Sequence, residues 1–391
     1  MKNEIFMLFK REYLSLNYKT KQYNFIIKFI LFVFLLSSFY CEIIKSKKNS
    51  SDRIDEIDKI NLISSQSNLN SFEMKKEFIA NLKSILKTDE IIENEMLEKH
   101  TTFRIGGPAR FFTKPKTIEQ IKEIIQLCNK YKVYYFILGN GSNLLVSDTG
   151  FNGVVIQIHE HNFSKLEVNK ENDETYVLNV GAGMLMKTLA IEACLLSLTG
   201  LEDIIDIPGT VGAGIIMNAS FIKLGLNIPL ESVKVITPEG KMLELSKAEC
   251  ELRFRDSMLK RKKYLVFEAT FKLKKGDQMK IQKTLTENTR MRYKNQPMYF
   301  GSAGCFFAWE RRKYGSLYEK YKENNLVGYK VGNIMIYTFN ISFIVNLGKG
   351  AAEDVMEIVN KIERTIKEKY NIIIRREVVV IGTIKGINYY F

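Results

Sequence analysis

Cysteine and histidine are scarce in this chain of 391 residues, and their positions disfavour two common kinds of site. The five cysteines include no closely spaced pair, and an odd number cannot complete a disulfide framework, so a reducing compartment is favoured for the globular part. The three histidines, His100, His159 and His161, show none of the usual ligand patterns, so no metal site is expected. The chain also lacks an internal repeat.

Long hydrophobic runs are missing as well. The run Phe29–Cys41 has 13 residues, whereas a membrane-spanning helix needs about 20. Lysines precede it, as they precede a signal-peptide core, so we predict a signal, anchor or targeting element that contacts a membrane or directs the chain to an organelle. An amphipathic or core helix is the alternative. Asn49–Asn70 is a polar linker, and residues 1–75 are left out of the predicted fold.

The remaining composition is that of a globular protein with two domains. Apolar residues make up 46% of the chain, and its length allows two ordinary cores. The net charge of +14 is spread along the sequence, which disfavours a nucleic-acid interface and fits an anionic small-molecule substrate. We expect an α+β fold with one domain over 76–276 and a smaller α/β domain over 277–391, and a cytoplasmic location for this globular part.

Local patterns predict the elements of both domains. Thr117 and Gln120 form a capping box before an apolar stripe, and the buried strand Val133–Leu138 completes an opening β–α–β unit. Leu265–Leu273 alternates as a half-buried strand. The other expected elements are helices over Lys76–Leu97, Met184–Leu198, Gln278–Arg292 and Ala351–Tyr370, strands over Thr101–Pro108, Gly153–Ile158, Tyr176–Val180, Ile372–Ile374 and Val378–Ile381, a hairpin turn over Thr237–Gly240 and a small-residue turn over Gly301–Phe307.

Two glycine-rich stretches indicate a cofactor that carries phosphate. The first, Leu138–Asp148, follows a strand, and its glycines can bring bare backbone close to a ligand. It lacks the third glycine of the dinucleotide fingerprint, and a plain tight turn is the alternative. The second, Ile207–Ala219, is of the same type. The residues expected to bind the cofactor in these stretches are Gly139, Asn140, Gly141, Ser142, Asn143, Pro208, Gly209, Thr210, Gly212, Gly214 and Asn218.

Three further positions place a reactive side chain in a constrained turn. Arg255 lies between Phe254 and Asp256, where it can form a fork for a carboxylate or pair with a nearby acid. Cys305 follows glycine and precedes two aromatic residues, so it is either a presented thiol or an inert buried one. Glu377 enters an apolar strand, and its alternative role is an ion pair with a neighbouring arginine.

Seven motifs together resemble one enzyme family. In chain order they read Thr-Phe-Arg-Ile-Gly-Gly-Pro-Ala, Leu-Gly-Asn-Gly-Ser-Asn-Leu-Leu-Val-Ser-Asp, Ile-Pro-Gly-Thr-Val-Gly, Phe-Arg-Asp-Ser, Ser-Ala-Gly-Cys-Phe-Phe, Phe-Ile-Val-Asn and Glu-Val-x-x-Ile-Gly. This order resembles UDP-N-acetylenolpyruvoylglucosamine reductase over about residues 80–382. That family makes UDP-N-acetylmuramate for peptidoglycan.

The resemblance implies a flavoenzyme whose FAD-binding domain is of the vanillyl-alcohol-oxidase type, followed by the smaller substrate domain. NADPH would reduce a non-covalently bound FAD, and the flavin would then pass hydride to C3 of the enolpyruvyl group. The two glycine turns would hold the FAD pyrophosphate, with Arg104 near the cofactor. Arg255, Cys305 and Glu377 match the family's catalytic positions. Arg255 would stabilise the substrate carboxylate, Glu377 would hydrogen-bond it, and Cys305 would protonate C2.

This chain departs from the family pattern beside the catalytic turn and on the next motif. Trp309 replaces an asparagine that helps to hold the nucleotide diphosphate, and Phe339–Ser342 differs from the usual run before Phe-Ile-Val-Asn. Two alternatives therefore stay open: another FAD-dependent oxidoreductase of the same fold, and a flavin-binding protein that has lost turnover. The retention of Arg255, Cys305 and Glu377 favours the reductase.

Overall fold

The computed structural model describes residues 76–219 and 228–389. The predicted signal or anchor segment, Phe29–Cys41, and the polar linker after it lie outside the described residues. Among the helices within the described ranges, none is both long enough and apolar enough to span a bilayer. Helices and strands are interspersed along the described residues, which confirms the mixed α and β class.

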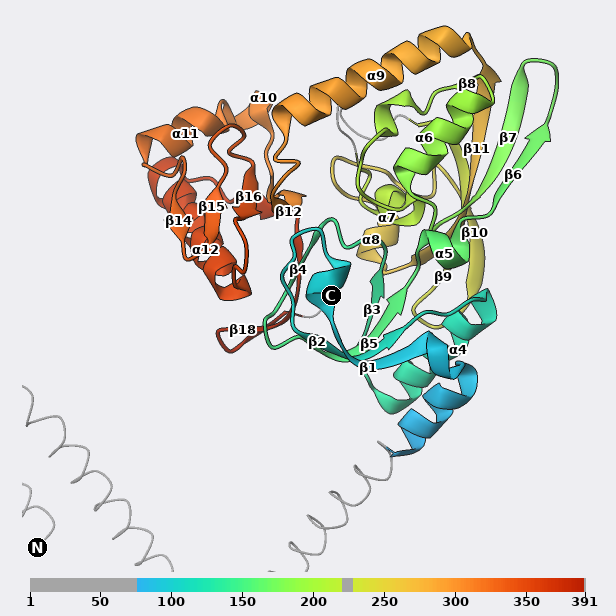
Figure 1. Ribbon diagram of the computed structural model, residues 1–391, viewed down its shortest axis with the longest axis horizontal. Coiled ribbons are helices and arrows are strands. Elements are labelled where there is room, and N and C mark those ends of the chain that lie inside the picture. Colours follow the sequence, from blue (N-terminus) through green and yellow to red (C-terminus); the bar gives the residue numbers. More distant parts are fainter. Residues whose placement is uncertain (1–75, 220–227, 390–391) are drawn as a thin grey trace, which may run out of the picture. The chain divides into compact units, whose positions relative to one another are not determined.

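Four strands form the first sheet, in the order β1 (Ile91–Met96), β2 (Pro108–Thr113), β5 (Phe151–Gln157) and β3 (Tyr135–Leu138) (Figure 1). β1 pairs antiparallel with β2, whereas β2 and β3 both pair parallel with β5. The helix α4 (Ile118–Tyr131) crosses from β2 to β3 and begins as predicted, because Thr117 accepts from the Gln120 N–H and the capping box is complete.

Two predictions for the segment before β2 are wrong. The lead-in helix covers residues 76–85, and β1 occupies the range that was expected to continue it. The expected strand at Thr101–Pro108 is a loop up to Gly107. Arg104 in that loop has a φ of 57°, which is incompatible with a strand.

Six strands form the second sheet, in the order β10 (Met242–Ser246), β9 (Leu230–Ile236), β11 (Leu265–Lys275), β7 (Thr175–Gly181) and β6 (Leu166–Lys170), with β8 (Leu198–Thr199) also on β11. The predicted hairpin between β9 and β10 is confirmed. The helices α6 (Met186–Leu195) and α7 (Val211–Ile216) contribute to the same apolar core. α6 ends earlier than predicted because the chain turns at Ser197, which has a φ of 57°, and continues as β8.

Four strands form the third sheet, in the order β12 (Gly301–Cys305), β16 (Phe343–Asn346), β15 (Ile334–Ile336) and β14 (Lys330–Val331). The predicted turn at Gly301–Phe307 is therefore wrong, since these small residues pair as a strand with β16. The helix α12 (Ala352–Tyr370) buries the predicted face of Val355, Ile358, Ile362 and Ile366 in a second core.

Two segments connect the sheets. The strand β18 (Val379–Ile384) pairs parallel with β4 (Leu144–Val146), directly after the first glycine turn, and with β19 (Ile387–Tyr389). The strand β17 (Arg375–Arg376) precedes β18 and pairs with β13 (Phe307–Ala308), and the predicted strand at Ile372–Ile374 is irregular chain.

The helix α9 (Gln278–Asn295) packs Ile281 and Leu285 into the first core. The division at residue 276 stays a prediction.

Short helices complete the described part: α5 (Glu160–Phe163), α8 (Met258–Arg261), α10 (Arg311–Tyr314), α11 (Leu317–Glu323), and the 3-10 helices η1 (Thr88–Glu90), η2 (Leu97–His100) and η3 (Glu202–Ile204). Because β18 follows β4 in register, the residue two positions before β18 must lie at the end of the first glycine turn. That residue is Glu377.

Candidate functional site

The two glycine-rich turns lie against each other at one cavity of about 620 Å³. Asn140 Nδ2 donates a hydrogen bond of 2.8 Å to the Pro208 carbonyl. A methyl group at Gly139 would come within 2.7 Å of Thr210 Oγ1. Most of the residues predicted to bind the cofactor line this cavity: Gly139, Asn140, Gly141, Ser142, Asn143, Thr210 and Gly212.

The first turn depends on glycine at one position in particular. Gly141 has a φ of 59°, and a Cβ there would come within 2.0 Å of the His100 carbonyl oxygen. The Thr102 N–H donates to the Gly141 carbonyl over 3.2 Å, which ties the turn to the loop before β2. Only a residue without a side chain allows this close approach.

The cavity lining fits a long ligand that carries both flat rings and phosphates. Its walls include the apolar surfaces of Tyr134, Ile158 and Ile216. Two lysines, Lys260 and Lys263, also line it and supply positive charge. An apolar pocket with a few polar groups at one edge is the usual form of a cofactor site, and this combination suits FAD.

The remaining predicted cofactor residues do not line the cavity. Arg104 is exposed on the loop before β2. Asn218 is buried and donates a hydrogen bond of 2.6 Å from Nδ2 to the Arg253 carbonyl. The others in this group are Pro208, Gly209 and Gly214.

A second cavity, of about 450 Å³, brings the three predicted catalytic residues together. Arg255, Cys305 and Glu377 all line it, although more than one hundred positions separate the first from the last in the sequence. Arg255 Nε lies 3.0 Å from Glu377 Oε1, and both side chains are largely buried. The structure therefore places a cation, a carboxyl group and a thiol at one wall.

Glu377 is held by backbone hydrogen bonds to two separate elements. Its N–H donates to the Phe306 carbonyl over 2.8 Å, which fixes it beside Cys305. Its carbonyl accepts a hydrogen bond of 3.0 Å from Asn143 Nδ2, at the end of the first glycine turn. Asn143 thus links the wall of the first cavity to the acid in the second.

Arg255 projects from a tight turn in which Arg253 and Asp256 pair through their backbones. Arg255 itself has a φ of 55°, an uncommon conformation for a residue with a side chain. Two other residues hold the turn. Asn218 donates to the Arg253 carbonyl, and Arg375 Nη2 donates to the Phe254 carbonyl over 2.9 Å.

Burial changes the protonation of the acid and the thiol in the same direction. It raises the pKa of Glu377, and the charges of Arg255 and Lys260 offset this only in part. Burial and the nearby Glu377 also raise the pKa of Cys305 to about 11, against smaller opposing effects of Arg255 and Arg292 and a hydrogen bond with Ser342. The thiol is therefore protonated at neutral pH.

Two basic residues near the site were missed by the sequence reasoning. Lys260 lines the first cavity, and its charge acts on Glu377. Arg292 is 7% exposed, and its charge acts on both Cys305 and Arg255. The sequence pattern could have indicated Arg292, because it follows Ile281, Leu285 and Asn288 at helical spacing on the buried face of α9.

The two departures from the family pattern both face the second cavity. Trp309 lines it, and Nε1 donates a hydrogen bond of 2.9 Å to the Gly315 carbonyl. Ser342 lines it too, and its carbonyl accepts from the Phe306 N–H over 2.8 Å. The cavity also contains the cation of Arg311, two residues after Trp309.

Comparison with known proteins gives one consistent family. Residues 109–246 match an FAD binding domain, and residues 296–381 match the C-terminal domain of UDP-N-acetylenolpyruvoylglucosamine reductase. A reductase of this name from Lachnoclostridium phytofermentans is 36% identical over 310 residues, which is 79% of this chain and 98% of that protein. One from Clostridium novyi is 36% identical over 302 residues, 77% of this chain and 95% of the relative.

A solved structure agrees with the sequence relatives. The crystal structure of UDP-N-acetylenolpyruvylglucosamine reductase from Thermus caldophilus superimposes with a TM-score of 0.61 at 32% sequence identity. The match covers 74% of this chain and 98% of that one. The predicted order, an FAD-binding domain followed by a second domain, is confirmed.

Proposed function

The chain belongs to the UDP-N-acetylenolpyruvoylglucosamine reductase family, and we propose that it reduces the enolpyruvyl group of the UDP sugar with Arg255, Cys305 and Glu377 as catalytic residues. It is an FAD-containing oxidoreductase of peptidoglycan precursor synthesis. The observation that carries the assignment of residues is the second cavity, where the cation, the thiol and the buried acid meet.

The first cavity is where we place the FAD. The backbone of residues 139–143 and the Thr210 turn would hold its diphosphate, with Lys260 and Lys263 as counter-charges and the apolar walls around its rings. When bound, FAD would supply the redox chemistry, the transfer of hydride from NADPH to C3 of the enolpyruvyl group. Arg104 belongs to the same proposal as a residue near the cofactor.

The protein's own residues manage charge and one proton. Arg255 donates to the enolpyruvyl carboxylate and stabilises the negative charge that builds on it as C3 is reduced. Burial raises the pKa of Glu377, so this carboxyl group takes up a proton more readily than an exposed one, and in its protonated form it can donate a hydrogen bond to the same carboxylate. Cys305 Sγ keeps its proton at neutral pH and gives it to C2, which completes the saturated lactyl ether.

The UDP part of the substrate would extend along the rest of the second cavity. Trp309 occupies the position of the family's diphosphate-binding asparagine, and Arg311 is the cation that the same wall offers to phosphate. The aromatic rings of Tyr318 and Phe339 also line this cavity, where a base can stack.

Separate measurement of the two half-reactions tests the proposal. In Cys305→Ala, bleaching of the flavin by NADPH should proceed near the wild-type rate, because no proton donor is needed. Reoxidation by the enolpyruvyl UDP sugar should slow by about 10²–10⁴-fold. Cys305→Ser is the matched control and should keep much of the rate, because a hydroxyl also donates. Rapid-mixing absorbance resolves both steps. Wild-type reoxidation in Cys305→Ala would exclude the thiol, and absence of reoxidation in the wild type would indicate a flavoprotein without turnover.

The subcellular location is the second part of the proposal. The described cysteines, Cys128, Cys194, Cys250 and Cys305, are all free thiols, which fits a reducing compartment such as the cytoplasm. We infer that Phe29–Cys41 targets or anchors this catalytic part. Fusion of residues 1–75 to a fluorescent protein tests the inference, because a diffuse signal throughout the cell would contradict it.

A further inference from the structure

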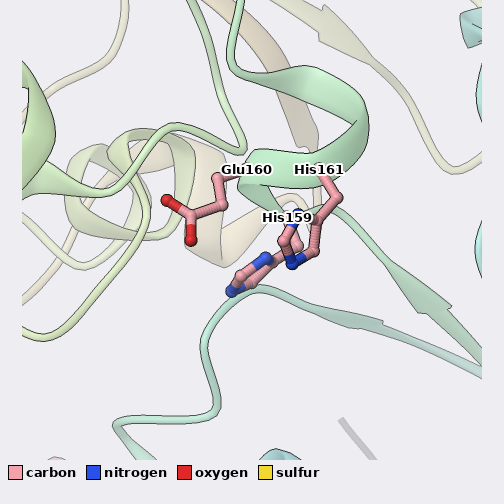
Figure 2. Close-up of side chains that lie close together, drawn as sticks. All are labelled: His159, Glu160 and His161. Carbon is pink, nitrogen blue, oxygen red and sulfur yellow. The ribbon is translucent and has the colours of Figure 1, made fainter.

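A cluster of three ligating side chains lies on the segment that leads from β5 into α5, outside the proposed catalytic cavity (Figure 2). One ring nitrogen of His159, one of His161 and a carboxylate oxygen of Glu160 lie within 4.8 Å of one another. We propose that this cluster binds one divalent transition-metal ion of the zinc type, at a site distinct from the reductase chemistry.

The hydrogen bonds around His159 leave one of its ring nitrogens ready to bind a metal. Asn140 Nδ2 donates to the Pro208 carbonyl, so the Asn140 amide must present Oδ1 on its other side. His159 Nε2 lies 3.3 Å from that oxygen and is therefore assigned as the N–H donor. The lone pair is then on Nδ1, a buried atom with no hydrogen-bond partner in the described part of the chain.

This arrangement is the one that protein metal sites use. A histidine that binds a metal through one nitrogen almost always donates its other N–H to a carbonyl or carboxylate, which fixes the ring and its tautomer. Asn140 Oδ1 supplies that acceptor here. The structure thus offers an unpartnered ring nitrogen on His159 and the outer group that orients the ring.

The backbone prepares His159 and His161 to converge. His159 is extended, with φ −134° and ψ 170°, and the next residue starts the short helix α5, so the two rings lie 5.2 Å apart between centroids. Gly183 packs directly on the His159 backbone, where a Cβ would come within 2.4 Å of the carbonyl oxygen. The backbone of His159 is therefore fixed in place. His161 is exposed, so a metal ion can reach the cluster from solvent on its side.

The donor set indicates the class of ion. Two imidazoles and one carboxylate suit Zn²⁺ and its neighbours, with water in the remaining position, whereas Mg²⁺ and Ca²⁺ prefer oxygen ligands throughout. Tetrahedral bonds of about 2.0–2.2 Å place ligand atoms about 3.4 Å apart, so ligand atoms that lie up to 4.8 Å apart must close in on the ion. Glu160 has no ion pair with a lysine or arginine within the described residues, so its carboxylate can make this movement without losing a partner.

Metal binding to the purified full-length holoprotein, prepared without a polyhistidine tag, tests the proposal. Calorimetric titration with Zn²⁺ at pH 7.5 should show one site per chain. The exposed variant His161→Gln should weaken it by at least about 10-fold, and so should His159→Gln. Asn140→Ala, which removes the outer group, should weaken it by about 10–100-fold. Because Asn140 also lines the cavity proposed for FAD, the flavin content of this variant is measured in the same sample. His100→Gln is the matched control and should leave the affinity nearly unchanged, because His100 pairs with Glu95 at 3.0 Å and is not one of the three clustered ligands.

Co²⁺ provides a spectroscopic second measurement. Bound Co²⁺ should show the visible bands of nitrogen and oxygen ligands without a sulfur charge-transfer band, and His161→Gln should lose them while its far-ultraviolet circular dichroism stays that of the wild type. No Zn²⁺ binding, binding retained in the double variant of His159 and His161, or a thiolate band from Cys305 would each overturn the proposal. None of these outcomes bears on the reductase assignment, whose tests use flavin absorbance.

Discussion

Gly141 and Gly386 both have a positive φ, but their surroundings differ. A Cβ at Gly141 would meet the His100 carbonyl at 2.0 Å, whereas a Cβ at Gly386 would meet nothing within 4 Å. Gly386→Ala should therefore lower the free energy of unfolding by only about 1–2 kcal/mol, the cost of a left-handed backbone for a residue with a Cβ. Gly141→Ala must also displace the backbone of the first glycine turn, so it should lose flavin on gel filtration. Equal flavin content and equal melting temperatures in the two variants would show that the turn adapts.

The raised pKa of Cys305 has a consequence for its reactivity. Because only the thiolate is alkylated and the pKa is about 11, the rate of Cys305 modification by iodoacetamide should rise about tenfold per pH unit from pH 7 to pH 10. An exposed thiol, with a pKa of about 8.5, would level off near pH 9. Mass spectrometry of the Cys305 peptide at each pH measures this, and an early plateau would mean that the site is not closed to solvent.

Among the elements, β16 ties the third sheet to the loop before β2 through a buried side chain, beside the hydrogen bonds that Ser302 of β12 makes with Thr102 of that loop. Its last residue, Asn346, is 5% exposed and uses both ends of its amide. Nδ2 donates to the carbonyls of Phe103 and Arg104, and Oδ1 accepts from the N–H groups of Gly348 and Gly350. The Phe-Ile-Val-Asn motif thus has a structural role, because it fixes the loop that carries Arg104.

Replacement of this amide by a carboxylate isolates the two donated hydrogen bonds. Asn346→Asp keeps the shape and the acceptor, but it places an anion against two carbonyl oxygens. The free energy of unfolding should fall by about 1–3 kcal/mol for each carbonyl left unsatisfied. Asn388→Asp is the control, because exposed Asn388 only accepts, from Thr383 Oγ1. Urea denaturation compares the two variants, and an Asn346→Asp protein as stable as the control would contradict this account of β16.

At the scale of the whole molecule, the first core begins with the helix at 76–85. Phe78, Leu82 and Leu86 are each at most 4% exposed and pack in the same core as α4 and β11. The described residues all belong to one compact unit. Residues 76–90 are therefore structural, although they precede every motif that identified the family.

Two truncations should differ for this reason. A chain that begins at Lys76 keeps all three core side chains and should bind FAD and unfold in a single cooperative transition. A chain that begins at Ile91 loses them, and because removal of one large core side chain costs about 2–5 kcal/mol, it should not fold stably. Calorimetry and flavin absorbance distinguish the two. Loss of flavin from the chain starting at Lys76 would place part of the fold within residues 1–75.

The sequence alone determined what depends on near neighbours and on motif order. The Thr117 cap, the alternating strand around Phe271 and the apolar face of α12 were predicted, because each is set by residues within a few positions along the chain. The family resemblance from seven motifs, with its FAD cofactor, is confirmed. The same reasoning selected Arg255, Cys305 and Glu377, whose catalytic roles remain proposals.

Only the tertiary structure decided how distant segments meet. Gly301–Cys305 is a strand because it pairs with β16. The strand expected around Arg104 is a loop, and Asn346 donates a hydrogen bond to the Arg104 carbonyl in that loop. Arg255 and Glu377 form their ion pair because the parallel pairing of β18 with β4 brings residue 377 back to the first glycine turn. The His159 cluster had no sequence signal, since its ligand nitrogen is set by Asn140 and Pro208 across the chain. Such contacts depend on packing between residues far apart in the sequence, which local patterns do not encode.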